Sequence, residues 1–105
     1  PIKVFECCIG RPTAPTLPGR DQVLDKMPEA YASKWDLWMP WWIGIYWAGG
    51  SENGIHALPL LSNGQILWAG YLGKGCSFGC IVLDTPDAKW LYDWAEVGIV
   101  VFVNS

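Results

Sequence analysis

A single stretch of this chain carries a full set of helix boundary signals, and it limits what the remainder can fold into. Thr85 suits the N-cap, Pro86 the first helical position and Asp87 the first turn. Gly98 stands where a glycine commonly follows the end of a helix. The sequence therefore predicts a helix of about three turns, from about Pro86 to Val97, and no other long helix.

The predicted helix has an apolar face that needs a partner. Ala88, Leu91 and Ala95 share one side of it, with Trp90 and Trp94 on the flank. Apolar and β-branched runs elsewhere predict strands at residues 2–9, 43–47, 55–58, 81–83 and 99–103. We therefore expect a mainly β domain, a sandwich-like structure with one helix packed on the sheet.

The segments between these runs are less regular. Prolines and a glycine in residues 11–20 predict a turn-rich loop, and residues 23–27 are a weak strand candidate because polar residues interrupt them. Residues 39–42 are expected to form an extended connection, and the Asn63-Gly64 pair predicts a hairpin. The last run, 99–103, is expected to be a buried final strand.

Composition excludes several classes of protein. The chain has 105 residues, half of them hydrophobic, which is enough for one small domain. Its formal net charge is −3 and it has no Lys/Arg cluster, so nucleic acid is not an expected partner. No apolar run reaches the ~18 residues of a transmembrane helix. The chain begins at Pro1 without a signal-peptide pattern, so we expect a mature or excised segment.

The cysteines leave the redox state open. They stand at Cys7, Cys8, Cys76 and Cys80, which permits a disulfide without requiring one. A zinc site from His56 and some thiols is conceivable, but the spacing fits no common ligand pattern, so we expect neither metal nor cofactor. We expect Cys7 and Cys8 to be buried as small hydrophobes. Cys76 could be a resolving thiol, a disulfide partner or a loop residue without a role, and we expect it to be dispensable for acyl transfer.

Cys80 is the strongest candidate for a reactive residue. It follows Gly79 and precedes the apolar run 81–83, so its sulfur should lie where a tight loop enters a sheet. His56 is the only histidine of the chain, in a short predicted strand, and a thiol with an imidazole is the minimum set for acyl transfer. Glycine at 79 would let the N–H groups of Phe78, Gly79 and Cys80 point at a developing oxyanion.

Aromatic residues are concentrated in residues 28–47, which contain five of the tryptophans. Core packing is the more common role for such rings, and an exposed aromatic face that contacts sugar or peptide is the alternative. Our candidates for substrate-binding residues are Trp41, Trp42, Tyr46 and Trp68.

These residues, in their order along the chain, resemble a known family. Gly54-Ile55-His56, a glycine-bearing segment, Ser77-x-Gly79-Cys80-Ile81-x-Leu83, Asp87-Ala88-x-x-Leu91-Tyr92 and then Gly98 before a β-branched strand are similar to the YkuD-type L,D-transpeptidase catalytic domain. The Gly10-Arg11-Pro12 turn extends the resemblance weakly towards residue 1. The resemblance implies a single catalytic domain over residues 1–105 that lacks the family's first strand or strands.

The resemblance also implies a reaction. Cys80 would attack a carbonyl of a peptidoglycan stem peptide, release D-alanine, and pass the thioester to the side-chain amine of a second stem. His56 would be the base, and Ser77 would position the turn or hold the histidine. The implied partners are peptidoglycan stem peptides and carbapenem-type inhibitors. The implied location is extracytoplasmic, in the periplasm or cell wall, and the oligomeric state stays open.

The chain departs from the family pattern at two positions. Val82 replaces the arginine usually found two residues after the cysteine, and Ala57 replaces the glycine often found after the histidine. An arginine would favour the thiolate and could hold a substrate carboxylate, so its absence leaves activity and substrate choice open. The rival hypotheses are a catalytically silent wall-binding module and a cysteine hydrolase that uses water as acceptor.

Overall fold

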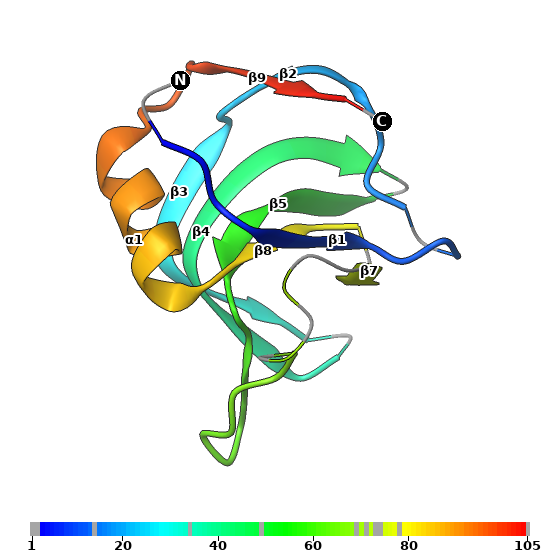
Figure 1. The fold of residues 1–105 in the computed structure, drawn as a ribbon, viewed down its shortest axis with the longest axis vertical. Helices are drawn as coiled ribbons and strands as arrows, with labels where there is room; N and C mark the ends of the chain where they lie inside the picture. Colours follow the sequence, from blue (N-terminus) through cyan, green and yellow to red (C-terminus); the bar gives the residue numbers. More distant parts are fainter. Residues whose placement is uncertain are drawn as a thin grey trace.

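The computed structural model describes residues 3–13, 15–33, 35–48, 50–68, 70, 72, 75–77 and 79–104, and of Cys76 only the backbone. The elements are β1 (Cys7–Gly10), β2 (Gly19–Gln22), β3 (Asp25–Ala32), β4 (Leu37–Ala48), β5 (Ser51–Ala57), β6 (Leu60–Leu61), β7 (Gly75–Ser77), β8 (Ile81–Leu83), α1 (Thr85–Trp94) and β9 (Val100–Val103). Strands dominate, and α1 is the one helix in the described part of the chain (Figure 1). The predicted mainly β class with one helix is confirmed.

A large sheet and a small one form the two layers. The large sheet has the strand order β3–β4–β5–β8–β1–β7, with β6 beside β4, and β2 pairs with β9 in the small sheet. Helix α1 packs on β4 and β5 (Figure 1). A buried cluster of Val23, Ile43, Ile45 and Ala95 lies between these layers. One face of the large sheet is therefore covered by α1 and the small sheet.

Parallel pairing of β5 with β8 brings the two candidate catalytic residues together. Ile55 stands in register with Ile81, and His56 with Val82. Cys80 directly precedes β8, so it lies beside the start of the strand segment that carries His56. Residues from separate parts of the sequence thus meet where β8 begins beside the second half of β5.

The helix is shorter than predicted. Its N-cap position is Asp84 rather than Thr85, without a side-chain capping hydrogen bond, and it ends at Trp94 instead of about Val97. Ala95 has an extended backbone and is 4% exposed, because its methyl group is part of the core between the helix and the sheets. Gly98, with φ +98°, belongs to the turn into β9, and its N–H donates to Val23 O at 2.8 Å.

Strand β4 corrects one prediction from the sequence. The expected connection at residues 39–42 is the middle of a continuous strand of 12 residues. Pro40 is tolerated there because β4 pairs with β3 on one side, while β6 and β5 pair only with its two ends on the other. The missing proline N–H therefore falls where β4 has a single neighbour.

Other boundaries differ because pairing, not local preference, decides them. The first strand begins at Cys7, the end of the predicted 11–20 loop is part of β2, and the weak 23–27 candidate is replaced by β3. The final strand is not buried, since Phe102 is 67% exposed and β9 has only β2 as a neighbour. The Asn63-Gly64 turn is present, with Leu61 N–H donating to Gln65 O at 2.9 Å.

Candidate active site

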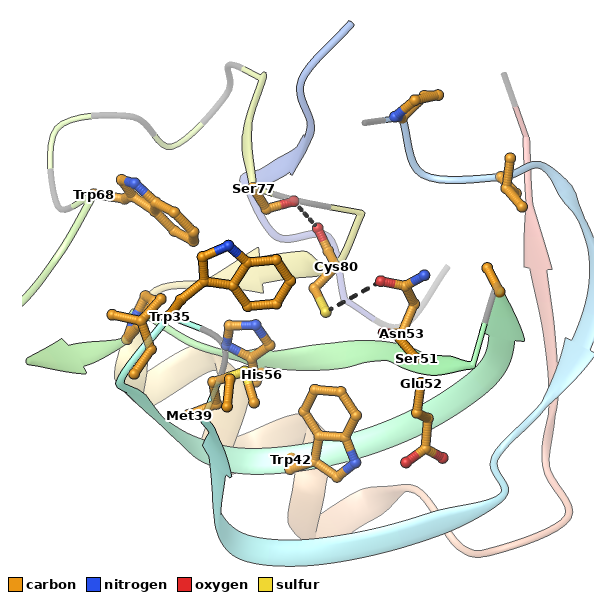
Figure 2. Close-up of a pocket in the computed structure, with 16 residues that line it drawn as sticks. Trp35, Met39, Trp42, Ser51, Glu52, Asn53, His56, Trp68, Ser77 and Cys80 are labelled. Carbon is orange, nitrogen blue, oxygen red and sulfur yellow. Dashed lines mark hydrogen bonds between the residues drawn. The ribbon is translucent and has the colours of Figure 1, made fainter. Parts of the chain in front are cut away.

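A cavity of about 600 Å³ opens on the face of the large sheet that the helix does not cover. Figure 2 shows Cys80 and His56 in the middle of the lining, with Trp35 and Trp68 towards one side of the view and Ser51, Glu52 and Asn53 towards the other. The lining residues are Pro15, Leu17, Ala32, Trp35, Leu37, Met39, Trp42, Ala48, Ser51, Glu52, Asn53, His56, Pro59, Trp68, Ser77 and Cys80. Both residues of the predicted thiol–imidazole pair therefore face one cavity.

The turn that carries Cys80 is held by Ser77. The Ser77 hydroxyl donates to Cys80 O at 2.5 Å and accepts from Gly79 N–H at 3.3 Å, and its side chain is buried. Gly79 has φ +129°, a backbone conformation that residues other than glycine rarely adopt. Of the two roles expected for Ser77, its hydrogen bonds fit positioning of the turn, and none joins it to His56. Phe78 lies outside the described residues.

The Cys80 thiol is protonated in the resting state. Its Sγ–H donates to Asn53 Oδ1 at 3.6 Å. Burial raises the thiol pKa to about 11, and the charge of Glu52 adds to this, although a hydrogen bond from Gly54 N–H acts in the opposite direction. The described lining of the cavity contains no Lys or Arg to stabilise a thiolate. The site therefore holds a neutral thiol, not a preformed thiolate–imidazolium pair.

His56 is a neutral base with a defined tautomer. The distance from His56 Nδ1 to the Ala57 carbonyl oxygen is 2.6 Å. Because a carbonyl oxygen can only accept a hydrogen bond, Nδ1 carries the proton and Nε2 has the lone pair. The side chain is 2% exposed, and burial lowers its pKa to about 4. No hydrogen bond joins the ring to Cys80, because the thiol donates to Asn53. His56 faces the cavity, while Ile55 and Ala57 pack on the other side of the sheet.

Two of the four aromatic candidates line the cavity. Trp42 and Trp68 do so, whereas Trp41 and Tyr46 are not among its lining residues, and a role in substrate binding stays a prediction for all four. The Trp41 ring lies 5.2 Å from the Tyr92 ring on the helix side. Tyr46 packs on the core, and its hydroxyl accepts from Leu17 N–H at 2.9 Å. Trp41 has φ +56°, so simple alternation along the strand fails at this point.

Sequence reasoning missed several lining residues. Asn53 and Glu52 act on the Cys80 thiol, and Trp35 lines the same cavity (Figure 2). Alternation along β5 places Glu52 and Gly54 on the same face as His56, so that signal was available for Glu52. No comparable signal pointed to Asn53 or Trp35.

Val82, which replaces the family's arginine, is fully buried. It lies with Cys8 and Leu58 in an apolar cluster, and Trp68 packs against that cluster. A guanidinium would have no solvent there. Of the cysteines, Cys7 and Cys80 are free thiols, whereas Cys8 is disulfide-bonded and not merely a small hydrophobe. The Cys76 side chain lies outside the described part of the chain, so the roles considered for it stay predictions.

Neither a metal centre nor a membrane span is found in the described parts of the chain. No group of three or more His, Cys, Asp or Glu side chains in them is arranged to hold a metal ion. Their single helix is too short and too polar to cross a bilayer.

Solved structures of similar fold have closely related architecture. An L,D-transpeptidase from Mycobacterium smegmatis is 23% identical with a TM-score of 0.81, over 99% of this chain and 49% of that one. An L,D-transpeptidase from Mycobacterium tuberculosis is 27% identical with a TM-score of 0.78, over 97% and 43%. The L,D-transpeptidase LdtMt1 in complex with imipenem is 19% identical with a TM-score of 0.82, over 98% and 49%. The chain thus spans less than half the length of each of these relatives.

The comparison with sequence families is more specific than the likeness of fold. No curated protein matches the chain. The family model of the YkuD L,D-transpeptidase catalytic domain, however, matches residues 1–103, which include β5 with His56 and the Ser77–Cys80 turn. The chain therefore belongs to the YkuD family of L,D-transpeptidase catalytic domains.

Proposed function

We propose that this domain is an L,D-transpeptidase that cross-links peptidoglycan stem peptides through a Cys80 acyl-enzyme. The observation that carries the proposal is the common cavity of Cys80 and His56, in which the imidazole keeps Nε2 free of a proton. Membership of the family supports the same reaction class. Because peptidoglycan lies outside the cytoplasm, the proposed location is extracytoplasmic.

The resting geometry suggests how the first step proceeds. The thiol turns its proton from Asn53 to His56 Nε2 while Sγ attacks the carbonyl carbon of the donor stem. Since the thiol pKa is raised and the imidazole pKa lowered, proton transfer accompanies attack and does not precede it. Gly79 N–H is already bonded to Ser77, so we assign Cys80 N–H as the oxyanion donor within the described turn.

The remaining steps return the proton. The imidazolium protonates the departing amine, the C–N bond breaks, and a thioester to Cys80 remains. The amine of a second stem then attacks the thioester carbonyl, His56 takes the proton that this amine loses, and the C–S bond breaks. His56 returns that proton to Cys80, so the free thiol is restored and the new amide bond is the only net product besides the released D-alanine.

A catalytically silent wall-binding module is the second candidate. It is favoured by one specific feature, the neutral thiol in a cavity whose described lining has no cation. A cysteine hydrolase differs from the transpeptidase only in the acceptor, since water would replace the amine.

Acylation by a carbapenem tests the proposal directly, since imipenem is bound in the structure of the relative LdtMt1. The protein is incubated with imipenem, its intact mass is read, and the adduct is located by peptide mapping. An adduct on Cys80 is the expected result, and a folded protein without one would favour the wall-binding module. Donor and acceptor stem peptides then separate the two enzymes: a cross-linked product supports the transpeptidase, and release of D-alanine with no need for acceptor indicates the hydrolase.

A further inference from the structure

Two carboxyl groups meet beneath the cavity, over a glycine of strand β4. Glu52 on β5 and Asp25 on β3 both reach over Gly44 of β4. A methyl group built on Gly44 would overlap Glu52 Oε2 and lie 2.8 Å from Asp25 Oδ1. Glycine at position 44 therefore makes room for both carboxyl groups.

The two groups need a proton between them. Glu52 Oε2 is buried and has no hydrogen-bond partner among the described residues, so an ionised Glu52 would leave it unpaired beside a second carboxylate. Burial and then Asp25 raise the Glu52 pKa to about 7. Near neutral pH, a proton on Glu52 can supply the missing hydrogen bond to Asp25. His56 and Cys80 are the other titratable groups that line this side of the cavity.

The carboxyl pair is connected to His56 through one tryptophan. Trp42 Nε1–H donates to Asp25 Oδ1 at 2.9 Å, and the indole is 3% exposed. Its ring stacks on the His56 ring, with centroids 5.8 Å apart and planes inclined by 21°. Gly54 leaves room for the Trp42 ring, because a methyl group on Gly54 would lie 3.0 Å from Trp42 Cζ2. In Figure 2 the Trp42 ring lies below both His56 and Cys80.

We propose that Asp25, with the proton it shares with Glu52, is a positioning residue for His56: its carboxylate anchors the Trp42 indole, which orients the imidazole in the cavity. Ala57 O holds one edge of the imidazole and Trp42 supports its face, so the two contacts together fix the ring. The catalytic part of this inference rests on the proposed function.

Asp25→Ala and Asp25→Asn form the central test. Alanine removes the acceptor for Trp42 Nε1–H, and we expect imipenem acylation of Cys80 to slow by about 10- to 100-fold as the base loses its position. Asparagine keeps an acceptor for the indole and can donate its amide to Glu52, so it should restore most of the rate. Trp42→Phe keeps a ring but loses the N–H, and it should give an intermediate rate even where Asp25→Ala fails to fold.

A readout independent of activity is available because His56 is the only histidine of the chain. Nitrogen-15 NMR of the imidazole should show a single Nδ1–H tautomer in the parent protein and Asp25→Asn, and a mixture of tautomers in Asp25→Ala. Val23→Ala, in the core on the other side of the sheet, is the matched control for lost stability and should leave tautomer and rate in place.

The outcomes separate the two ideas. An unchanged tautomer and rate in Asp25→Ala overturn the positioning role, as does an equal loss in Asp25→Asn or in Val23→Ala. A parent protein that imipenem never acylates overturns the proposed function instead, while the NMR comparison still decides whether Asp25 positions the imidazole.

Discussion

The two faces of the large sheet use buried side chains in different ways. On the face covered by α1 and the small sheet, Val23, Ile43 and Ile45 belong to a buried hydrophobic cluster. On the cavity face, buried Trp42 and His56 are fixed by hydrogen bonds and by a ring stack. One face therefore supplies stability through buried apolar area, while on the other face hydrogen bonds between buried polar groups hold side chains of the candidate site in place.

Two neighbouring tryptophans make the contrast within one strand. Trp41 packs on Tyr92 of the helix, and the Lys89 ammonium lies 5.2 Å from its ring centre. Trp42 turns to the cavity and donates to Asp25. The same residue type thus packs against the helix on one face and lines the cavity on the other, which residue identity alone does not reveal.

The largest expected effect on acylation comes from replacing Cys80, and replacing Cys7 on the other face is its control. Cys80→Ala should abolish acylation by imipenem, because the attacking sulfur is gone. Cys7, the other free thiol among the described side chains, packs on the helix-covered cluster, and burial also raises its pKa. Cys7→Ala should therefore keep the full adduct in intact-mass spectra. An adduct that is lost in Cys7→Ala and kept in Cys80→Ala would reverse the roles assigned to the two faces.

Replacing the base should have the next largest effect. His56→Ala removes the acceptor for the thiol proton, and the acylation rate should fall by about 10²–10⁴-fold with some reaction left. Stopped-flow or mass-based kinetics at neutral pH measure it, with far-UV circular dichroism as the check on folding. A loss below about threefold would show that the thiol reacts without this base.

A core substitution should affect stability and leave the chemistry alone. Ile43 is 1% exposed on the helix-covered face, and Ile43→Ala should reduce the free energy of unfolding by about 2–5 kcal/mol. Urea titration followed by tryptophan fluorescence gives that value. The acylation rate of the folded variant, measured well below its unfolding transition, should stay within about twofold of the parent. A large loss of rate would mean that the two faces are coupled.

The smallest effect is expected from Glu52→Gln, measured in a Cys7→Ala background with alkylation of Cys80 read by peptide mapping. The glutamate raises the thiol pKa, so its removal should speed iodoacetamide alkylation at about pH 8–9 by a few-fold. The Glu52 pKa is itself raised, so its stabilising contribution is present at low pH and lost as the pH rises through about 7. Melting temperatures between about pH 4.5 and pH 7 should therefore decline less in the variant. Identical profiles would remove Glu52 from this network.

Short-range sequence signals were sufficient for part of the fold and of the candidate site. The helix start near Pro86, the strand at 81–83 and the turn with Gly79 depend on a few adjacent residues whose backbone preferences are strong. The motif around Cys80, with the only histidine, likewise predicted which two side chains would face one cavity. These features follow from local geometry, so one sequence is enough to find them.

Tertiary structure alone decided the rest. The helix ends earlier than predicted because Ala95 packs into the core with an extended backbone. The final strand is half-exposed because only β2 pairs with it. Trp41 and Trp42 differ in role because of a local backbone change in β4, and Asp25 meets Glu52 because β3 and β5 flank Gly44. Such contacts join residues far apart in the chain, and they are fixed by strand register and by which face is covered, neither of which a local pattern of residues contains.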